Sequence, residues 1–421
     1  MTRRLLMGID VGTTGLKVVV ADADGTLLAQ CGEEYGTRYP QPNWAEQDPE
    51  QWWRACCAVT PRALELAGAQ GRDVAGVGVS GQGIGVVAVD AAGTPLRPAI
   101  IWLDRRSDAQ CAQLRETVGE EAITAINGAR IDSFYLAPKW LWVKEREPEV
   151  YRQTAAVLQS NGYLIQRLTG ARRFSAADGP MTLFFDAANL RYHEGLAARM
   201  GIDLAQMPPV ARPADVVGTL MQQAAAAIGL SAGTPIVAGS VDGVAAAVEG
   251  GVLEDGDATE MTGQSTVILI CASRPYLGRE LISLVHAAPG KYLAVGGSAA
   301  GGGSLRWWRD TLADTEHAQA LREGRDPFQV LDELAAGSPP GANRLVFLPY
   351  LYGERSPIWD TDARGVFFGL SMSTTKSDMV RAVLEGAAFG LRHNMEAAAA
   401  AGFTVSALNC VGGGARSALW N

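Results

Sequence analysis

The chain has 421 residues, of which 48% are hydrophobic and 19% charged. This length exceeds what one core usually serves, so two domains are expected, and the composition excludes extended disorder. A net charge of −9 excludes an overall basic surface for nucleic acid. The six cysteines lack paired spacing and the four histidines are scattered, which argues against structural zinc and predicts a reducing, cytosolic setting. No apolar run predicts a membrane span.

Two short apolar runs open the chain, over 5–9 and 16–21. They are too short and too rich in β-branched residues for helices, so they predict a hairpin, and Gly12 and Gly15 allow its tight reversal. Exposed N–H groups and hydroxyls in such a turn can bind an anion, and a carboxylate at its edge can hold hydrated Mg²⁺. An ordinary hairpin whose aspartate caps the turn is an equal alternative. The polar residues concerned are Asp10, Thr13, Thr14 and Lys17.

The next elements extend this hairpin. Residues 26–31 predict a third strand and thus an antiparallel meander. A helix is expected over 49–68, and Pro61 inside it predicts a kink or a break. Further strands are expected over 74–80 and, as a second hairpin, over 86–89 and 99–102.

The middle of the chain, 107–229, is expected to be mostly helical, and Trp140 and Trp142 within it to serve packing. A strand over 234–238 then leads through a turn to a helix from residue 244, and we place the domain boundary between residues 240 and 241.

Residues 258–270 repeat the form of the opening stretch, in which a strand is followed by a turn of glycine and hydroxyl residues and then by a second strand. Such an internal repeat predicts two domains of like fold. The glycine run 296–303 predicts a flexible turn before an amphipathic helix, and an alanine-rich helix is expected over 378–401. A strand over 405–411 then leads to a helix that has barely begun at Asn421, so further residues are expected after it.

Five motifs occur in a fixed order, and together they resemble the FGGY family of carbohydrate kinases, with xylulokinase-like pentulose and polyol kinases the nearest in pattern. The resemblance implies an α/β fold of two duplicated RNase-H-like (actin-like ATPase) domains with an interdomain cleft, 1–240 and 241–421. The motifs are 8–17, 44–53, 138–142, 353–357 with 364–370, and 412–417.

The resemblance also implies roles for individual residues. Asp10 would hold Mg²⁺ through water, and Asp242 would be the catalytic base. The residues that would contact ATP are Thr13, Thr14 and Lys17 at the β- and γ-phosphates, Gly263, Gln264 and Ser265 in a second phosphate loop, and Gly413, Gly414 and Ala415 beside adenosine. With residues missing after Asn421, ATP binding would be weak.

Asp242 has an independent chemical rationale. A sugar hydroxyl needs a base within hydrogen-bond reach while the γ-phosphoryl is held in line and its charge is neutralised. The alternative is a helix N-cap, since Asp242 precedes Gly243 and a predicted helix, and both roles are compatible.

A polyol pocket favours amides and carboxylates for hydroxyls and an aromatic wall for the carbon face. By this criterion the expected sugar contacts are Gln82, Trp102, Asp104 and Arg105, and the resemblance adds Asp242 and Gly243. A surface turn with a weak ion pair is the alternative for Asp104 and Arg105. The chain departs from the family pattern at Gln82-Gly83-Ile84, where many xylulokinases carry Gln-Met-His, at Gly243, often Asn, and at Gln264, usually Thr.

We therefore expect an ATP- and Mg²⁺-dependent kinase that phosphorylates a ketopentose such as xylulose on a primary hydroxyl. Erythritol, ribulose, L-xylulose and gluconate are alternative acceptors, and a non-catalytic nucleotide- or sugar-dependent regulator on the same fold is the alternative from another class. The resemblance allows a homodimer and implies neither nucleic acid nor membrane as a partner.

Overall fold

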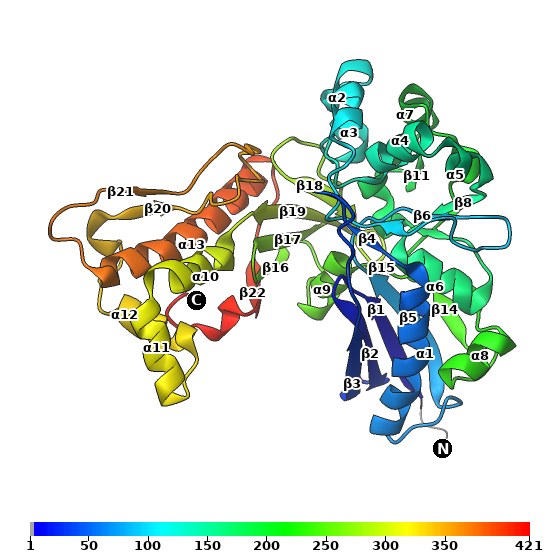
Figure 1. Cartoon of the computed structure of the whole chain (residues 1–421), viewed down its shortest axis with the longest axis horizontal. Helices are drawn as coiled ribbons and strands as arrows, with labels where there is room; N and C mark the ends of the chain where they lie inside the picture. The colour runs from blue at the N-terminus through cyan, green and yellow to red at the C-terminus, as the bar shows by residue number, and fades with distance from the viewer. Residues whose placement is uncertain (1–3) are drawn as a thin grey trace. The chain divides into compact units, whose positions relative to one another are not determined.

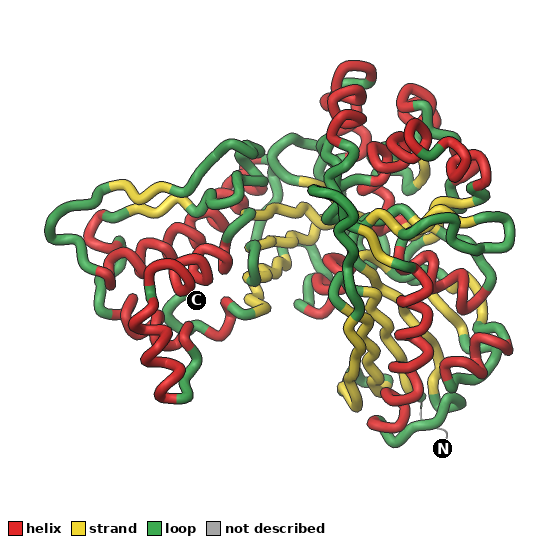
Figure 2. The backbone as a smooth tube through the Cα atoms, in the orientation of Figure 1, coloured by secondary structure: helices red, strands yellow, loops and turns green. Residues whose placement is uncertain are grey.

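The computed structural model describes residues 4–421, which form two compact units. One unit runs to Ala246 and includes Ser283–Lys291, and the other comprises Ala247–Ile282 and Tyr292–Asn421. Each unit has a mixed β-sheet with helices packed on it, so the predicted two-domain α/β fold is confirmed (Figures 1 and 2). None of the helices in the described part of the chain has the length and apolarity that a bilayer crossing demands.

The main sheet of the first unit has the strand order β13-β14-β5-β1-β2-β3, with β15 also paired to β5. Strands β1, β2 and β3 form the predicted antiparallel meander, and β5 joins β1 in parallel. The strands are β1 (Leu5–Val11), β2 (Gly15–Asp22), β3 (Leu27–Glu34), β5 (Val74–Gly81), β13 (Val216–Thr219), β14 (Pro235–Val237) and β15 (Ser240–Val241).

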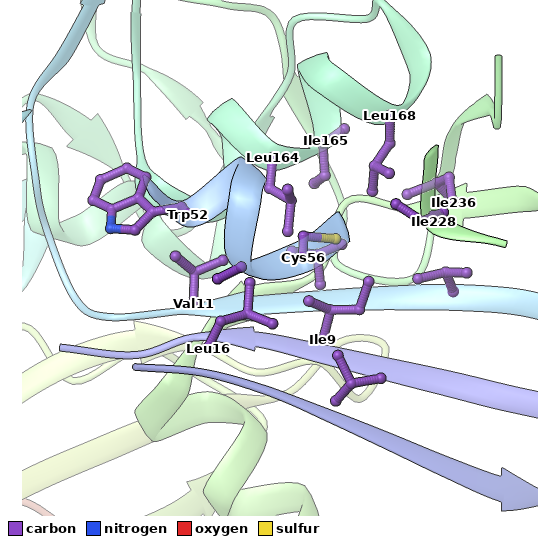
Figure 3. Close-up of a cluster of buried hydrophobic side chains, with 14 of the residues drawn as sticks. Ile9, Val11, Leu16, Trp52, Cys56, Leu164, Ile165, Leu168, Ile228 and Ile236 are labelled. Atoms are coloured by element: carbon purple, nitrogen blue, oxygen red, sulfur yellow. The ribbon is translucent and has the colours of Figure 1, made fainter. Parts of the chain in front are cut away.

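Helices α1 (Pro49–Leu66) and α6 (Ser160–Thr169) contribute to the core of this unit. Asp48 starts α1 by accepting a hydrogen bond from the Glu50 N–H, and Pro49 suits the first helical position. Pro61 lies inside α1, which continues to Leu66, so the predicted break is absent. The α1 face that carries Trp52 and Cys56 is buried against strand residues such as Ile9 (Figure 3). This burial outweighs the loss of the backbone hydrogen bond that Pro61, which has no N–H, cannot donate.

The predicted pairing of 86–89 with 99–102 is only partly right. Single bridges join Val86 to Ile100 and Val89 to Pro95, but β6 (Val87–Val89) forms its ladder with β8 (Ala156–Leu158). Strand β7 (Ala99–Ile100) pairs instead with β4 (Glu46–Gln47). Partners distant in sequence therefore replace most of the local hairpin.

The rest of the first unit is mostly helical, as expected, and Trp140 and Trp142 are buried in it. The helical elements are α2 (Asp108–Thr117), α3 (Glu120–Asn127), α4 (Leu136–Arg146), α5 (Pro148–Gln153), η1 (Ala176–Thr182), α7 (Glu194–Met200), η2 (Leu204–Gln206) and α8 (Gln222–Ile228). Helix α9 (Asp242–Glu249) crosses the division between the units. The short strands are β9 (Phe174–Ser175), β10 (Phe185–Asp186), β11 (Arg191–Tyr192) and β12 (Val210–Ala211), and β18 (Ile282–Val285) straddles the division between the units.

The second unit repeats the strand order of the first. Its sheet contains β19-β17-β16-β22, in which β16, β17 and β19 form an antiparallel meander and β22 joins β16 in parallel, as β5 joins β1. The predicted internal repeat is thus present in the topology. These strands are β16 (Asp257–Thr262), β17 (Thr266–Ala272), β19 (Tyr292–Ser298) and β22 (Ala407–Gly412).

The glycine run is not the flexible turn predicted from the sequence. Strand β19 extends to Ser298, and α10 (Gly301–Leu312) begins three residues later. The remaining elements are α11 (Asp314–Glu323), α12 (Pro327–Ala336), η3 (Ala342–Arg344), β20 (Val346–Leu348), β21 (Val366–Phe368), α13 (Lys376–Ala400) and η4 (Gly414–Arg416). A capping box of Thr375 and Asp378 starts α13, and the short η4 stands where a new helix was expected.

Candidate functional site

The turn after β1 has the geometry of a tight hairpin. The Gly12 N–H donates to the Gly15 carbonyl at 3.1 Å. Asp10 lies opposite Lys17 on β2 and opposite Ser80 on β5, whose hydroxyl donates to Asp10 Oδ1 at 2.8 Å. The structure thus brings one carboxylate and one exposed lysine to the same end of the sheet.

Three side chains from outside the hairpin hold this turn in place. The Tyr35 hydroxyl donates to the Gly12 carbonyl at 2.6 Å. Gln47 Nε2 donates to the Thr13 carbonyl at 2.7 Å, and the Trp102 indole N–H donates to the Thr13 hydroxyl at 2.8 Å. The turn is therefore fixed by β4 and by the segments that follow β3 and β7.

Two of the predicted sugar contacts lie directly against this turn. Trp102 bonds to Thr13 and packs edge-on against Phe134, with ring centroids 6.0 Å apart. Gln82, which follows β5, is 3% exposed and donates from Nε2 to Gln47 Oε1 at 2.8 Å. Its Oε1 is buried and has no hydrogen-bond partner in the described part of the chain, so one acceptor is left over.

Asp104 and Arg105 are placed differently. The Asp104 carboxylate is fully buried and accepts from the Ala45 N–H at 2.6 Å and from the backbone and guanidinium of Arg106. It is not the exposed residue that the surface-turn alternative requires, and its oxygens are already occupied by protein donors. Arg105 forms a two-point ion pair with Asp132 at 2.5 and 3.1 Å and stays partly exposed.

Asp242 is the first residue of α9 and follows β15, which pairs with β5 at Ser80. The side chain is open to solvent, yet the protein around it displaces much of the water near the carboxylate. This loss of water around the carboxylate raises the pKa of Asp242 to about 6. The Gly243 N–H, which donates to Oδ1 at 2.7 Å, opposes the shift, and the negative charge of Asp10 adds a smaller rise. The same bond satisfies a first-turn N–H of α9.

Gly239 makes the approach of this strand possible. It has a φ of 68°, and a Cβ there would lie 1.7 Å from the Val79 carbonyl oxygen. Only glycine tolerates both the left-handed backbone and this contact, which brings the chain alongside β5 just before Asp242.

Sequence reasoning missed Asp178, a buried carboxyl in η1. Its Oδ1 accepts from the Val241 N–H at 2.7 Å, directly before Asp242, and its Oδ2 accepts from Asn161 at 2.9 Å. Burial, with a smaller contribution from the charge of Asp242, raises its pKa to about 7. No local motif marks Asp178, because its partners come from α6 and β15.

In the second unit, the turn Gly263-Gln264-Ser265 closes with a bond from the Gly263 N–H to the Ser265 carbonyl at 2.9 Å. The first turn of α10 packs on it, and the Gly303 N–H donates to the Gln264 carbonyl at 2.8 Å. A Cβ on Gly302 would lie 2.1 Å from the Gly263 carbonyl oxygen, so the approach requires glycine. The positive end of a helix dipole thus lies beside the predicted second phosphate loop.

The predicted adenosine residues Gly413, Gly414 and Ala415 follow β22, which pairs with β16 up to Thr262. A Cβ on Gly414 would lie 2.7 Å from the Thr262 side chain. The structure therefore brings these residues to the same end of the sheet as the second turn.

The first unit also contains a cavity of about 600 Å³ away from the predicted site residues. It is lined by residues of α1, α6, α8 and the loop 91–94, and none of the predicted site residues borders it. Among residues 4–421 no group of three or more histidine, cysteine or acidic side chains could hold a metal ion by itself.

Two family models match the chain. The N-terminal domain of the FGGY family of carbohydrate kinases matches residues 5–249, and the C-terminal domain matches residues 261–421. A xylulose kinase from Staphylococcus epidermidis is 32% identical over 100% of this chain and 82% of its own. The solved structure of xylulose kinase from Rhodospirillum rubrum superimposes with a TM-score of 0.92 at 32% identity, covering 99% of this chain and 83% of that one.

A gluconate kinase from Lactobacillus acidophilus is also similar in structure. It has a TM-score of 0.89 and 26% identity, again over 99% of this chain and 83% of that one. Relatives named for two different acceptors thus share one fold with this protein. Because the two family models together cover nearly all of its residues, the chain belongs to the FGGY family of carbohydrate kinases.

Proposed function

We propose that the protein transfers the γ-phosphoryl group of ATP to a primary hydroxyl of a ketopentose such as xylulose, with Asp242 as the general base. The observation that carries the proposal is the position of Asp242, solvent-accessible at the start of α9, beside the strand end that bears Gln82 and under the charge of Asp10. A carboxylate with a pKa of about 6 is ionised at neutral pH and still basic enough to accept a hydroxyl proton. Similarity to xylulose kinases supports the choice of acceptor.

The two hairpin turns are the proposed phosphate contacts. The oxygens of the transferred phosphoryl group need hydrogen-bond donors and positive charge. In the first unit we assign this role to the hydroxyls of Thr13 and Thr14 and to the ammonium group of Lys17. Gly263, Gln264 and Ser265 are proposed for the second loop, with the N-terminus of α10 adding its dipole, and Gly413, Gly414 and Ala415 are proposed for the adenosine.

Asp10 fits a hydrated Mg²⁺. Its Oδ1 accepts from Ser80, and a Cβ at Gly12 would come within 3.2 Å of Oδ2, so the glycine keeps the space beside this oxygen open. A single carboxylate suffices because Mg²⁺ in kinases keeps several waters and takes its other ligands from substrate phosphates. The ion, when bound, would neutralise charge on the phosphates.

Gluconate is the second candidate acceptor. The likeness to a gluconate kinase favours it. The sequence Gln82-Gly83-Ile84 departs from the Gln-Met-His of many xylulokinases. The proposed sugar contacts are Gln82, Trp102, Asp242 and Gly243. Asp104 and Arg105 are also proposed, and each would have to contact the sugar while bonded to a charged neighbour.

The test is an ADP-release assay with D-xylulose, L-xylulose, D-ribulose, erythritol, glycerol and gluconate. We expect turnover with a ketopentose, and we expect Asp242→Asn to lower it roughly 10²–10⁴-fold while nucleotide binding is retained. Turnover of the native chain should fall as pH drops through about 6, because protonation removes the base. No ADP release with any acceptor would favour the regulator, and full activity of Asp242→Asn would reject the assigned base.

A further inference from the structure

We propose that Gln47 is a positioning residue that connects the acceptor-side amide of Gln82 to the backbone of the first phosphate turn. The idea rests on the proposed function, because it takes Gln82 as a sugar contact and the turn as a phosphate contact. Gln47 lies in β4, within the motif 44–53, and it is not among the site residues predicted from the sequence.

The amide of Gln47 is 1% exposed and makes four hydrogen bonds. Its Nε2 donates to the Thr13 carbonyl at 2.7 Å and to the Thr37 hydroxyl at 2.9 Å. Its Oε1 accepts from Trp52 Nε1 at 3.0 Å and from Gln82 Nε2 at 2.8 Å. If the amide were turned over, its NH₂ group would face the N–H groups of Trp52 and Gln82, and its oxygen would face the Thr13 carbonyl. The orientation of the amide is therefore fixed.

The bond to the Thr13 carbonyl has a consequence for the turn. The carbonyl of Thr13 and the N–H of Thr14 belong to one planar trans peptide and point in opposite directions. Because Gln47 holds the carbonyl toward itself, the Thr14 N–H is directed away from Gln47. Tyr35 acts on the preceding peptide in the same way, since its hydroxyl donates to the Gly12 carbonyl. Both bonds preset the backbone donors that an anion would meet.

The bond to Gln82 has a consequence for the acceptor side. Gln47 takes the Nε2 of Gln82 as a donor, which leaves Gln82 Oε1 buried and without a partner among residues 4–421. A buried acceptor without a partner costs free energy, and a donor hydroxyl would relieve that cost. Gln47 thereby determines that Gln82 offers a hydrogen-bond acceptor to the sugar, while the same amide orients the phosphate turn.

The test compares Gln47→Leu with Gln166→Leu. Gln166 is a matched control, because it is also a buried amide of the first unit that donates to a main-chain carbonyl, that of Gly93, at 3.0 Å. We expect both variants to lower the melting temperature. Only Gln47→Leu should raise the KM for ATP and for the acceptor, with kcat/KM reduced roughly 10–10²-fold, and weaken MgADP binding measured by calorimetry.

A purely structural role predicts that Gln47→Leu loses stability and active fraction but keeps both KM values and the MgADP affinity, and this result would overturn the proposal. If Gln47→Leu fails to fold, the isosteric Gln47→Glu replaces it. That change keeps an acceptor for Trp52 and Gln82 but sets an oxygen against the Thr13 carbonyl, so ATP binding should suffer more than acceptor binding. Equal KM values to the native chain would reject the idea.

The two proposals fail in different ways. If the native chain phosphorylates no acceptor, the proposed function fails, while MgADP binding still reports whether Gln47 orients the phosphate turn. If the native chain is active and Gln47→Leu binds MgADP and acceptor normally, the positioning role alone is rejected.

Discussion

The two hairpins at the centres of the two sheets share a topology but differ in chemistry. In the first, Asp10 and Lys17 face each other one pair before the strands end, and in the second the equivalent pair is Met261 and Val267. The first turn is held by side chains from neighbouring elements, whereas the second is packed by the glycines of α10. A duplicated scaffold has thus placed ionisable groups on one copy and backbone donors on the other.

The acidic side chain of the second hairpin nearest its turn, Glu260, points into the interior. It is buried, and its Oε2 accepts from the Thr262 hydroxyl at 2.6 Å. Thr262 in turn bonds to Thr266 across the strand end, at 2.9 Å. Strand periodicity explains the contrast, because Glu260 and Asp10 differ by one position relative to the turn and so point to opposite faces of their sheets.

The largest effect should come from removing the carboxylate that distinguishes the first hairpin. Asp10→Asn should lower kcat/KM by roughly 10²-fold or more, because the Mg²⁺ that this carboxylate would hold, and that would neutralise charge on the transferred phosphate, is bound less tightly. It should also lower the pKa of Asp242, since one of the causes that raise it is removed, although burial, the larger cause, stays. Activity assays and an NMR titration of the carboxyls measure the two effects. An unchanged Asp242 pKa would show that the two charges do not interact.

An intermediate effect is expected at the second hairpin. Gly302→Ala would place a Cβ 2.1 Å from the Gly263 carbonyl oxygen and displace α10 from the turn. We expect a loss of about 1–3 kcal/mol in the free energy of unfolding and a raised KM for ATP. Gly36→Ala is the control, since a Cβ there meets nothing within 4 Å. If Gly302→Ala left both stability and KM intact, close packing of α10 would not matter to the turn.

The smallest effect concerns Glu260→Gln. Burial raises the pKa of Glu260 above its ordinary value, so the folded state holds its proton more tightly than the unfolded state does. The stability of the native chain should therefore fall as pH rises from the unfolded pKa to the folded one, and Gln, which does not titrate, should remove this dependence. Denaturant unfolding at pH 4 and pH 8 measures it, and identical pH profiles of the two proteins would contradict the assignment.

Much of the molecule follows from local pattern. Alternating or continuous apolar runs bounded by glycine identified the first hairpin, its repeat at 258–270 and the long α13, since period and turn residues are properties of adjacent positions. Pattern was misleading in the glycine run 296–303, where close packing on a turn outweighs intrinsic preference, and of the kink or break predicted at Pro61 the break is absent because a helix face is buried there.

The sequence alone therefore determined the two-domain α/β fold, the paired turns and the family, because these depend on short motifs and their order. Only the tertiary structure decided which atoms of those residues are available. It joined Gln47 to both Gln82 and Thr13, occupied the Asp104 carboxylate with Arg106, and bonded Asp178 to the Val241 N–H, directly before Asp242. Each of these contacts links segments whose proximity depends on strand pairing and helix packing, which no local pattern specifies.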